Sequence, residues 1–271
     1  MCEPGAVKIG LMSDIHGNRH ALEAVVADAA ECGVGRWWVL GDLVAIGPDP
    51  VQAVELITNL PDVQIISGNT ERYVLTDDRP PPHPDAVVAE PELLSLYGLI
   101  QRSFAWTSGA LAAHGWLDWL RELPPEVRSV LPDGTTVLGV HASPGQDDGD
   151  GITPHRDEQE LRREFADAGA KLVFAGHTHQ PTDRVVDGVR AVNLGSVSNP
   201  ITDDLRASYV ILHADRHRLG VEHRRVSYDQ DAFLDAVAQS GHPASDYIAS
   251  FQRGEQFRYP ARRPGAPEPT T

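Results

Sequence analysis

Apolar positions in the first third of the chain alternate between two spacings, which predicts strands alternating with helices. Residues 7–12, 36–40 and 63–66 are short apolar runs of the kind that form buried strands. Between these runs, residues 18–32 and 49–59 carry apolar side chains at helical spacing. The β-α-β-α-β order of the five segments predicts a sheet with parallel character.

The middle of the chain changes character before strands resume. Residues 76–91 are rich in Pro and Asp, which predicts an irregular loop. Residues 93–123 have helical spacing, and we expect two helices with a break near Ser108-Gly109. The remaining elements are expected as strands at 127–131, 136–140, 172–175, 184–186, 189–193, 208–213 and 220–226, and as helices at 157–168, 232–238 and 245–252.

Length and composition fit a globular protein with one large domain or two small ones. The 271 residues are 41% hydrophobic and 23% charged, which is ordinary for such proteins. We expect one domain over residues 1–258, with a helical insertion at about 91–123 and a disordered tail over residues 259–271. No run approaches the ~20 apolar residues that span a bilayer. Residues 1–5 lack a signal-peptide pattern and the two cysteines are not expected to pair, so we expect a cytoplasmic protein.

Side chains that bind metals occur just beyond the predicted strand ends. The candidates are Asp14, His16, Asp42, Asn69, His141, His177 and His179. In open α/β sheets ligands bind at this edge, and alternate residues that leave a strand point the same way. Taken singly, each has an ordinary explanation, such as a helix cap, a left-handed turn or a strand-end histidine. Their common placement predicts one shared metal site.

The mixture of imidazole, carboxylate and amide ligands fits two divalent cations that act on a phosphoester. Two cations about 3.5–4 Å apart can hold a phosphate, lower the pKa of a bridging water and stabilise the leaving oxygen. Asp42 is the candidate bridging carboxylate, and Asn69 adds a neutral oxygen that limits the negative charge facing the substrate. We assign Asp42, Asn69 and His141 to the catalytic centre. The ligand set suits Mn²⁺, Fe²⁺, Zn²⁺, Co²⁺ or Ni²⁺, with Mn²⁺ favoured for activity.

Five blocks in this order resemble the calcineurin-like metallophosphoesterase superfamily, whose pattern is D-x-H, G-D, G-N, a later H, and G-H-x-H. The blocks here are Asp14-Ile15-His16, Gly41-Asp42, Gly68-Asn69, His141 and Gly176-His177-Thr178-His179. The similarity continues through Gly195-Ser196-Val197 and Arg206-Ala207-Ser208-Tyr209. Residues 13–25 resemble the small bacterial YfcE-like and diadenosine-tetraphosphatase-like branch.

The resemblance implies both a fold and a role for each ligand. The implied fold is α/β, a four-layer β-sandwich of two mixed sheets flanked by helices, with a small helical cap insertion. One metal is implied to lie on Asp14, His16 and His179. The other is implied to lie on Asn69, His141 and His177, with Asp42 between the two metals.

One position departs from the family pattern. Many members follow the Asn with a histidine that contacts the phosphate, whereas this chain has Thr70 and then Glu71. Without that histidine we expect substrates with a low leaving-group pKa, such as pyrophosphate linkages or aryl phosphates. Guanidinium groups pair well with phosphate, so the candidate substrate-binding residues are Arg72, Arg206 and Arg19, although each could be an ordinary surface arginine.

The net charge of −16 disfavours a nucleic acid partner, because a phosphodiester polymer would be repelled. We expect a small phosphorylated substrate, such as a nucleotide or a dinucleoside polyphosphate. The sequence predicts a metal-dependent phosphodiesterase or phosphoanhydride hydrolase that uses a metal-bridging hydroxide. Two alternatives stay open: a metal-dependent phospho-ligand binding or sensor module with weak catalysis, and a protein phosphatase.

Overall fold

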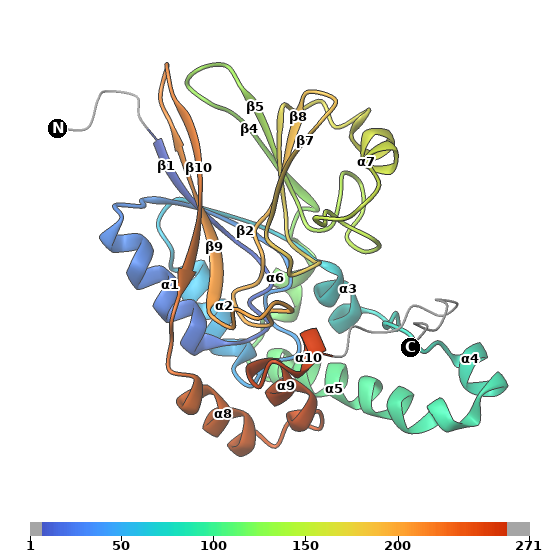
Figure 1. Ribbon diagram of the computed structural model, residues 1–271. Helices are drawn as coiled ribbons and strands as arrows, with labels where there is room; N and C mark the ends of the chain where they lie inside the picture. Colours follow the sequence, from blue (N-terminus) through green and yellow to red (C-terminus); the bar gives the residue numbers. More distant parts are fainter. Residues whose placement is uncertain (1–6, 259–271) are drawn as a thin grey trace.

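Two five-stranded β-sheets packed face to face form the centre of the protein (Figure 1). The computed structural model describes residues 7–258, so the tail predicted over residues 259–271 lies outside the described residues. The first sheet has the order β10 (Leu219–Val226), β9 (Ala207–Ala214), β1 (Val7–Met12), β2 (Arg36–Leu40) and β3 (Val63–Ile66). The second has the order β4 (Glu126–Val130), β5 (Thr136–Val140), β6 (Leu172–Ala175), β8 (Val189–Asn193) and β7 (Thr182–Val186).

Both sheets mix parallel and antiparallel pairs. Strand β1 pairs parallel with β2, and β2 with β3, which confirms the parallel character predicted for the first third of the chain. Strand β9 runs antiparallel to both β1 and β10. In the second sheet β5, β6 and β8 are parallel, with β4 and β7 antiparallel at the edges.

Side-chain alternation along β2 decides which layer each residue fills, because successive strand residues point to opposite faces. Trp38 and Leu40 face the second sheet and pack in one buried cluster with Phe174. Trp37 and Val39 point the other way and pack with helices α1 (Arg19–Glu31) and α2 (Pro50–Thr58). One strand therefore supplies both the core between the sheets and the core beneath the helices.

Helix α7 (Glu158–Phe165) covers the outer face of the second sheet (Figure 1). Its Leu161 and Phe165 share a buried cluster with Leu138 of β5 and Val173 of β6. The layers are therefore helices, sheet, sheet and helix, which is the four-layer α/β sandwich that the family resemblance implied.

The helical region between β3 and β4 in the sequence differs from the prediction at two places. It comprises α3 (Asn69–Leu75), α4 (Pro84–Ala89), a 3₁₀ turn (Pro91–Leu93), α5 (Leu94–Ala113) and α6 (Leu117–Arg121). The prediction of an irregular loop over residues 76–91 was wrong in part, because α4 lies within it with a proline at its first position, where the missing N–H costs no hydrogen bond.

The break predicted near Ser108-Gly109 was also wrong. Helix α5 runs through both residues, since a glycine in a helix costs only about 1 kcal/mol and packing can offset it. The helix ends instead at Ala113. Gly115, two residues later, has φ +77°, and the Trp116 N–H donates to the Leu111 carbonyl at 3.0 Å. This is a glycine-based helix C-cap, and the sequence alone did not show that Gly115 and not Gly109 would form it.

The C-terminal helices α8 (Gln230–Gln239), α9 (Ser245–Gln252) and α10 (Glu255–Arg258) follow the last strand. Phe233 and Val237 of α8 pack with Ile248 of α9 in a small core of their own. Among residues 7–258, no helix combines the length and the apolar character needed to cross a bilayer. The expected cytoplasmic location stays a prediction.

Candidate metal centre

All seven predicted ligands lie at the carboxyl ends of strands, and the two sheets bring those ends together. Asp14 and His16 follow β1, Asp42 follows β2, Asn69 follows β3, His141 follows β5, and His177 and His179 follow β6. The loops are joined across the sheets, because the His177 N–H donates to the Asp14 carboxylate at 3.0 and 3.1 Å. Within the first sheet the His16 N–H donates to the Asp42 carbonyl at 2.9 Å.

An unusual backbone conformation is concentrated at these ligands. Among the described residues, the non-glycine residues with positive φ include Asp14 (56°), His16 (48°), Asp42 (54°), His177 (68°) and His179 (56°). Side chains with a Cβ rarely adopt this region unless the surrounding structure imposes it. The loops therefore hold these five ligands in costly conformations, which is typical of functional sites.

The glycines beside the ligands are needed for close approach. Gly41 has φ +81°, and a Cβ at this position would lie 2.6 Å from the Gly68 nitrogen and 2.7 Å from His141 Nδ1. A Cβ on Gly176 would collide with Asp14. Any larger residue would push apart the strand ends that carry the ligands.

The first group of ligands consists of Asp14, His16 and His179, all of them buried or nearly so. The Nε2 atoms of His16 and His179 lie 3.1 Å apart, and Asp14 Oδ1 lies 3.2 Å from His179 Nε2. Asp42 Oδ2 lies 3.8 Å from His16 Nε2, so its carboxylate borders this group.

The second group consists of Asn69, His141 and His177. Asn69 Oδ1 lies 2.9 Å from His141 Nε2 and 3.0 Å from His177 Nδ1. The other carboxylate oxygen of Asp42, Oδ1, lies 3.2 Å from His141 Nε2. Asp42 therefore reaches both groups, one with each oxygen.

Each histidine turns its outer nitrogen to a backbone carbonyl, which fixes the ring and its tautomer. The four donor–acceptor pairs are His16 Nδ1 to Ala45, His141 Nδ1 to Leu40 (2.7 Å), His177 Nε2 to Gly149 (2.9 Å) and His179 Nδ1 to Asn199 (2.6 Å). When a ring is neutral, its inner nitrogen carries a lone pair that points into the site.

This arrangement fits divalent cations, because each group gathers atoms that are all acceptors once its histidines are neutral. In the first group the inner nitrogens of His16 and His179 lie 3.1 Å apart, and a carboxylate oxygen of Asp14 lies 3.2 Å from the His179 nitrogen. In the second group the amide oxygen of Asn69 lies 2.9 Å from the inner nitrogen of His141 and 3.0 Å from that of His177. Converging lone pairs repel unless a proton or a cation lies between them, and mixed His, carboxylate and amide sets suit transition metals.

The electrostatics of the site keep the carboxylates ionised. Burial alone would raise the pKa of Asp42, but the neighbouring His141 lowers it well below its usual range. The pKa of Asp14 is lowered in the same way by His179 against the effect of burial. Burial lowers the pKa of His141, yet Asp42 outweighs it and raises that pKa to about 10. A cation must therefore displace a proton from His141 when it binds.

Glu71 supports the candidate site and was not assigned in the sequence analysis. It is fully buried, and its carboxylate accepts hydrogen bonds from the N–H groups of Asp42, Leu43 and Gly68, each at 2.8 Å. Burial together with the nearby Asp42 charge raises the pKa of Glu71 to about 7. Glu71 therefore fixes the Asp42 turn relative to the Asn69 turn.

Asn193 holds the histidine turn of the second sheet and was also missed. Its amide donates to the Gly176 carbonyl and to Thr178 Oγ1 at 2.9 Å. Its carbonyl oxygen accepts from the Gly195 N–H at 2.9 Å. Gly195 belongs to the Gly195-Ser196-Val197 segment that resembles the family, and its N–H helps to orient the Asn193 side chain.

The three candidate phosphate-binding arginines all face carboxylates. Arg72 donates to Asp147 at 2.7 and 3.0 Å, and Arg206 donates to Asp204 at 2.9 and 2.7 Å. Arg19 lies on α1, with Glu23 3.7 Å from its guanidinium. Their assignment to a substrate stays a prediction.

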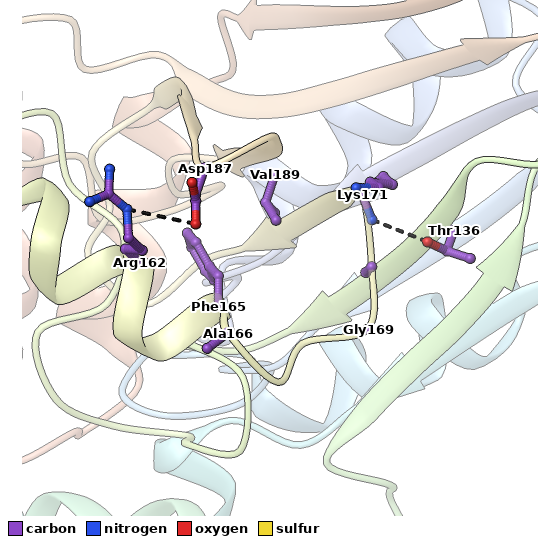
Figure 2. A pocket seen from close by; sticks show the side chains of 9 residues that line it. Thr136, Arg162, Phe165, Ala166, Gly169, Lys171, Asp187 and Val189 are labelled. Carbon is purple, nitrogen blue, oxygen red and sulfur yellow. Dashed lines mark hydrogen bonds and ion pairs between the residues drawn. The ribbon is translucent and has the colours of Figure 1, made fainter.

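Two cavities help to locate the chemistry. One of about 660 Å³ is lined by Arg72, Glu126 and the loop over residues 145–149, whose Gly149 carbonyl contacts His177. The other, of about 310 Å³, lies against α7 and the amino ends of β5, β6 and β8 (Figure 2). There Arg162 forms an ion pair with Asp187 beside Phe165 (Figure 2). This second cavity lies at the strand ends opposite to the ligands, so the first is the one beside the candidate metal centre.

Comparison with known proteins identifies the family. The Calcineurin-like phosphoesterase superfamily domain matches residues 7–217. The chain belongs to this superfamily. A metallophosphoesterase from Sphaerobacter thermophilus is 26% identical with a TM-score of 0.70, covering 92% of this chain and 99% of that one. A hypothetical protein from Pyrococcus horikoshii is 21% identical with a TM-score of 0.75, covering 90% and 97%. An uncharacterised protein from Methanocaldococcus jannaschii is 28% identical over 240 residues, or 82% of this chain and 88% of the relative.

Membership of the calcineurin-like superfamily agrees with the site geometry. The superfamily suggests a phosphoester hydrolase, and in this chain Asp and His side chains gather in groups that could hold a metal ion. The sequence resemblance to this family is therefore confirmed. Its fold is confirmed as well, by the two mixed sheets and by their likeness to the Pyrococcus horikoshii structure.

Proposed function

We propose that this protein hydrolyses a small phosphodiester or phosphoanhydride, with a nucleotide-type substrate preferred, and that it does so with two divalent cations. The observation that carries the proposal is the position of Asp42, whose two oxygens lie 3.8 Å from His16 Nε2 and 3.2 Å from His141 Nε2. A carboxylate that reaches two ligand groups from opposite oxygens is suited to bridge two cations.

The chain offers three side chains for each cation, in addition to Asp42. Asp14, His16 and His179 would hold one, and Asn69, His141 and His177 would hold the other. When bound, two such cations neutralise phosphate charge and activate a water for attack. Asn69 contributes a neutral oxygen, which keeps the negative charge of the ligand set from repelling the phosphate.

The residue after Asn69 supports a substrate with a good leaving group. Thr70 is buried, and its hydroxyl has no hydrogen-bond partner in the described part of the chain. A hydroxyl of ordinary pKa is a poor proton donor to a leaving alkoxide. A phosphoanhydride or an activated diester needs no such donor, whereas an alkyl monoester does.

Charge around the site supports a small substrate over a polymer. The neighbouring cavity of about 660 Å³ is lined by Glu126, Asp147 and Asp148. These carboxylates, together with the overall charge of −16, would repel a long polyanion. We therefore propose a small phosphorylated substrate instead of a nucleic acid or a phosphoprotein.

The test is metal add-back on the full chain. Protein stripped with a chelator is assayed on bis-p-nitrophenyl phosphate, p-nitrophenyl phosphate and a panel of nucleotides, with Mn²⁺, Fe²⁺, Zn²⁺, Co²⁺ or Ni²⁺ restored singly. We expect turnover of the diester to return with metal, with Mn²⁺ the most effective. The Asp42→Asn variant should lose at least the ~10–100-fold that removal of a ligand's partner costs.

Asp62→Asn is the matched control, because Asp62 also has positive φ but pairs with Arg36 at the opposite end of the sheet. It should behave as wild type. No turnover with any metal would exclude the hydrolase, and tight binding of a nucleotide without turnover would support the sensor alternative, which the inert Thr70 side chain favours.

A further inference from the structure

A buried polar network connects the first ligand group to the C-terminal helices. Its members are Asn18, Ser198, Asn199, Tyr228 and Gln252. Tyr228 and Gln252 lie beyond residue 217, where the match to the superfamily domain ends. The network therefore connects residues outside the family match to residues inside it.

Every polar atom of the Gln252 amide has a partner. Gln252 is only 6% exposed; its Nε2 donates to the Ser198 carbonyl at 2.9 Å, and its Oε1 accepts from the Tyr228 hydroxyl at 2.7 Å. Gln230 donates to the same Oε1 at 3.3 Å. A buried amide satisfied in this way has one orientation. In the flipped amide, Oε1 would face the Ser198 carbonyl oxygen and Nε2 would face the amide nitrogen of Gln230.

The peptide that Gln252 holds is adjacent to the carbonyl that orients His179. Gln252 binds the carbonyl of Ser198, and the next carbonyl along the chain, that of Asn199, accepts from His179 Nδ1 at 2.6 Å. Ser198 Oγ also donates to Asn199 Oδ1 at 3.0 Å. A tilt of this peptide would turn the Asn199 carbonyl and with it the imidazole ring.

The same network reaches the other two ligands of the first group. The Ser198 N–H donates to the carbonyl of Asp14 at 3.1 Å. Asn18 donates to Ser198 Oγ at 3.1 Å and to the Tyr228 hydroxyl at 3.3 Å, and it lies two residues after His16. The outer nitrogens of the second group have different partners, Leu40 and Gly149.

We propose that Gln252, oriented by Tyr228, is a positioning residue for the first cation site. The α8–α9 unit fixes the Ser198–Asn199 peptide and thereby holds His179 in the orientation that binds a cation. The proposal rests on the proposed function in one respect, which is that a cation binds to Asp14, His16 and His179. It extends the metal centre to a segment that the family match does not cover.

The test measures cation binding separately from activity. Chelator-stripped full-length protein is titrated with Mn²⁺ by calorimetry and by electron paramagnetic resonance, and wild type should bind two ions. Loss of a hydrogen-bond partner of a metal-binding histidine costs about 10–100-fold in affinity, and Gln252 acts one step further away. Gln252→Ala should therefore weaken one site roughly tenfold and leave the other unchanged.

Two further variants separate positioning from packing. Gln252→Glu keeps the length and the acceptor for Tyr228 but places an oxygen against the Ser198 carbonyl, so the loss should equal or exceed that of Gln252→Ala. Tyr228→Phe should give a smaller loss at the same site. Gln239→Ala, an exposed position on α8, is the control and should bind both ions as wild type does.

A second measurement works without metal. Nitrogen chemical shifts of the imidazoles report the tautomer, and in the metal-free protein Gln252→Ala should change the signals of His179 while those of His141 stay in place. Equal weakening of both sites, or a lower unfolding temperature with unchanged affinities, would show that Gln252 only packs α9 and would overturn the proposal. If wild type binds no cation, the proposed function fails, and the His179 signals still decide the positioning role.

Discussion

The Arg72 guanidinium donates two parallel hydrogen bonds to the Asp147 carboxylate, at 2.7 and 3.0 Å. The next residue along each segment pairs as well, since the Tyr73 hydroxyl donates to Asp148. One residue further, the Gly149 carbonyl accepts from His177 Nε2 at 2.9 Å. Arg72 therefore anchors the loop whose carbonyl orients a ligand of the second group, and its geometry differs from that of a free guanidinium awaiting phosphate.

Replacing Arg72 by Gln tests whether it anchors the loop or binds substrate. If it anchors the loop, Arg72→Gln should weaken Mn²⁺ binding at one of two sites by about tenfold, as for other partners of metal ligands. Arg72→Lys should recover little, because an ammonium cannot form the paired geometry. The measurement is Mn²⁺ titration together with KM for bis-p-nitrophenyl phosphate, with Arg36→Gln, an exposed ion pair with Asp62, as control.

The phosphate-binding interpretation makes the opposite forecast. A guanidinium that leaves Asp147 to meet the substrate would, when removed, raise KM and leave both Mn²⁺ affinities as they were. Unchanged metal binding with a raised KM would therefore restore Arg72 to the substrate-binding role that the sequence suggested.

Glu71→Gln should loosen the turn that carries Asp42. The Glu71 carboxylate accepts three backbone N–H groups, and an amide would turn its own donors toward at least one of them. A buried N–H left without a partner costs about 1–3 kcal/mol. We expect a loss of that size in the free energy of unfolding of the metal-free protein, measured with urea, together with weaker Mn²⁺ binding.

Glu55→Gln on the exposed face of α2 is the control for this substitution and should change neither quantity. Full stability with unaltered Mn²⁺ binding in Glu71→Gln would mean that the three hydrogen bonds contribute nothing to the placement of Asp42.

The positions of the candidate ligands were predictable from sequence because each follows a strand end. Asp14, Asp42 and His141 come within two residues of β1, β2 and β5, so the apolar pattern of the strand fixed where each side chain would emerge. Glu71 was not predictable in this way. Its partners Asp42 and Leu43 are 29 and 28 residues distant in sequence, so only the packed structure shows that its carboxylate is buried.

Gln252, the C-terminal residue proposed to support the site, could not be predicted from sequence for the same reason. Gln252 lies 54 residues from Ser198, and in sequence it is one more polar residue near the end of a helix. The wrong helix break has a local cause instead, because Gly109 and Gly115 look alike in sequence and only Gly115 adopts positive φ. The spacing of apolar residues predicted the helices and strands. The long-range polar contacts and the backbone conformation could be learned only from the structure.

His242 is buried where the C-terminal helices contact α5, and we predict that it makes this contact sensitive to pH. It is 3% exposed, between α8 and α9, and its ring meets Trp106 of α5 edge to face at 4.7 Å. Its Nδ1 accepts from the Ala244 N–H at 3.1 Å, so Nε2 carries the proton that faces Ser103 Oγ at 3.4 Å. Burial lowers the pKa of His242 to about 4, and the ring is neutral in the folded protein.

Acidification should therefore destabilise the protein through His242. Between pH 6.5 and about 4 the unfolded chain binds a proton at this residue that the folded protein does not, so the free energy of unfolding falls as the pH falls. At ~1.4 kcal/mol per pKa unit, the full difference is about 3 kcal/mol. Urea unfolding of the metal-free protein at pH 7 and pH 4.5 should show a smaller acid loss in His242→Gln than in wild type, while the exposed His217→Gln keeps the wild-type loss. An identical acid loss in wild type and His242→Gln would mean that the ring is protonated in the folded protein too, and that α5 and the C-terminal helices tolerate its charge.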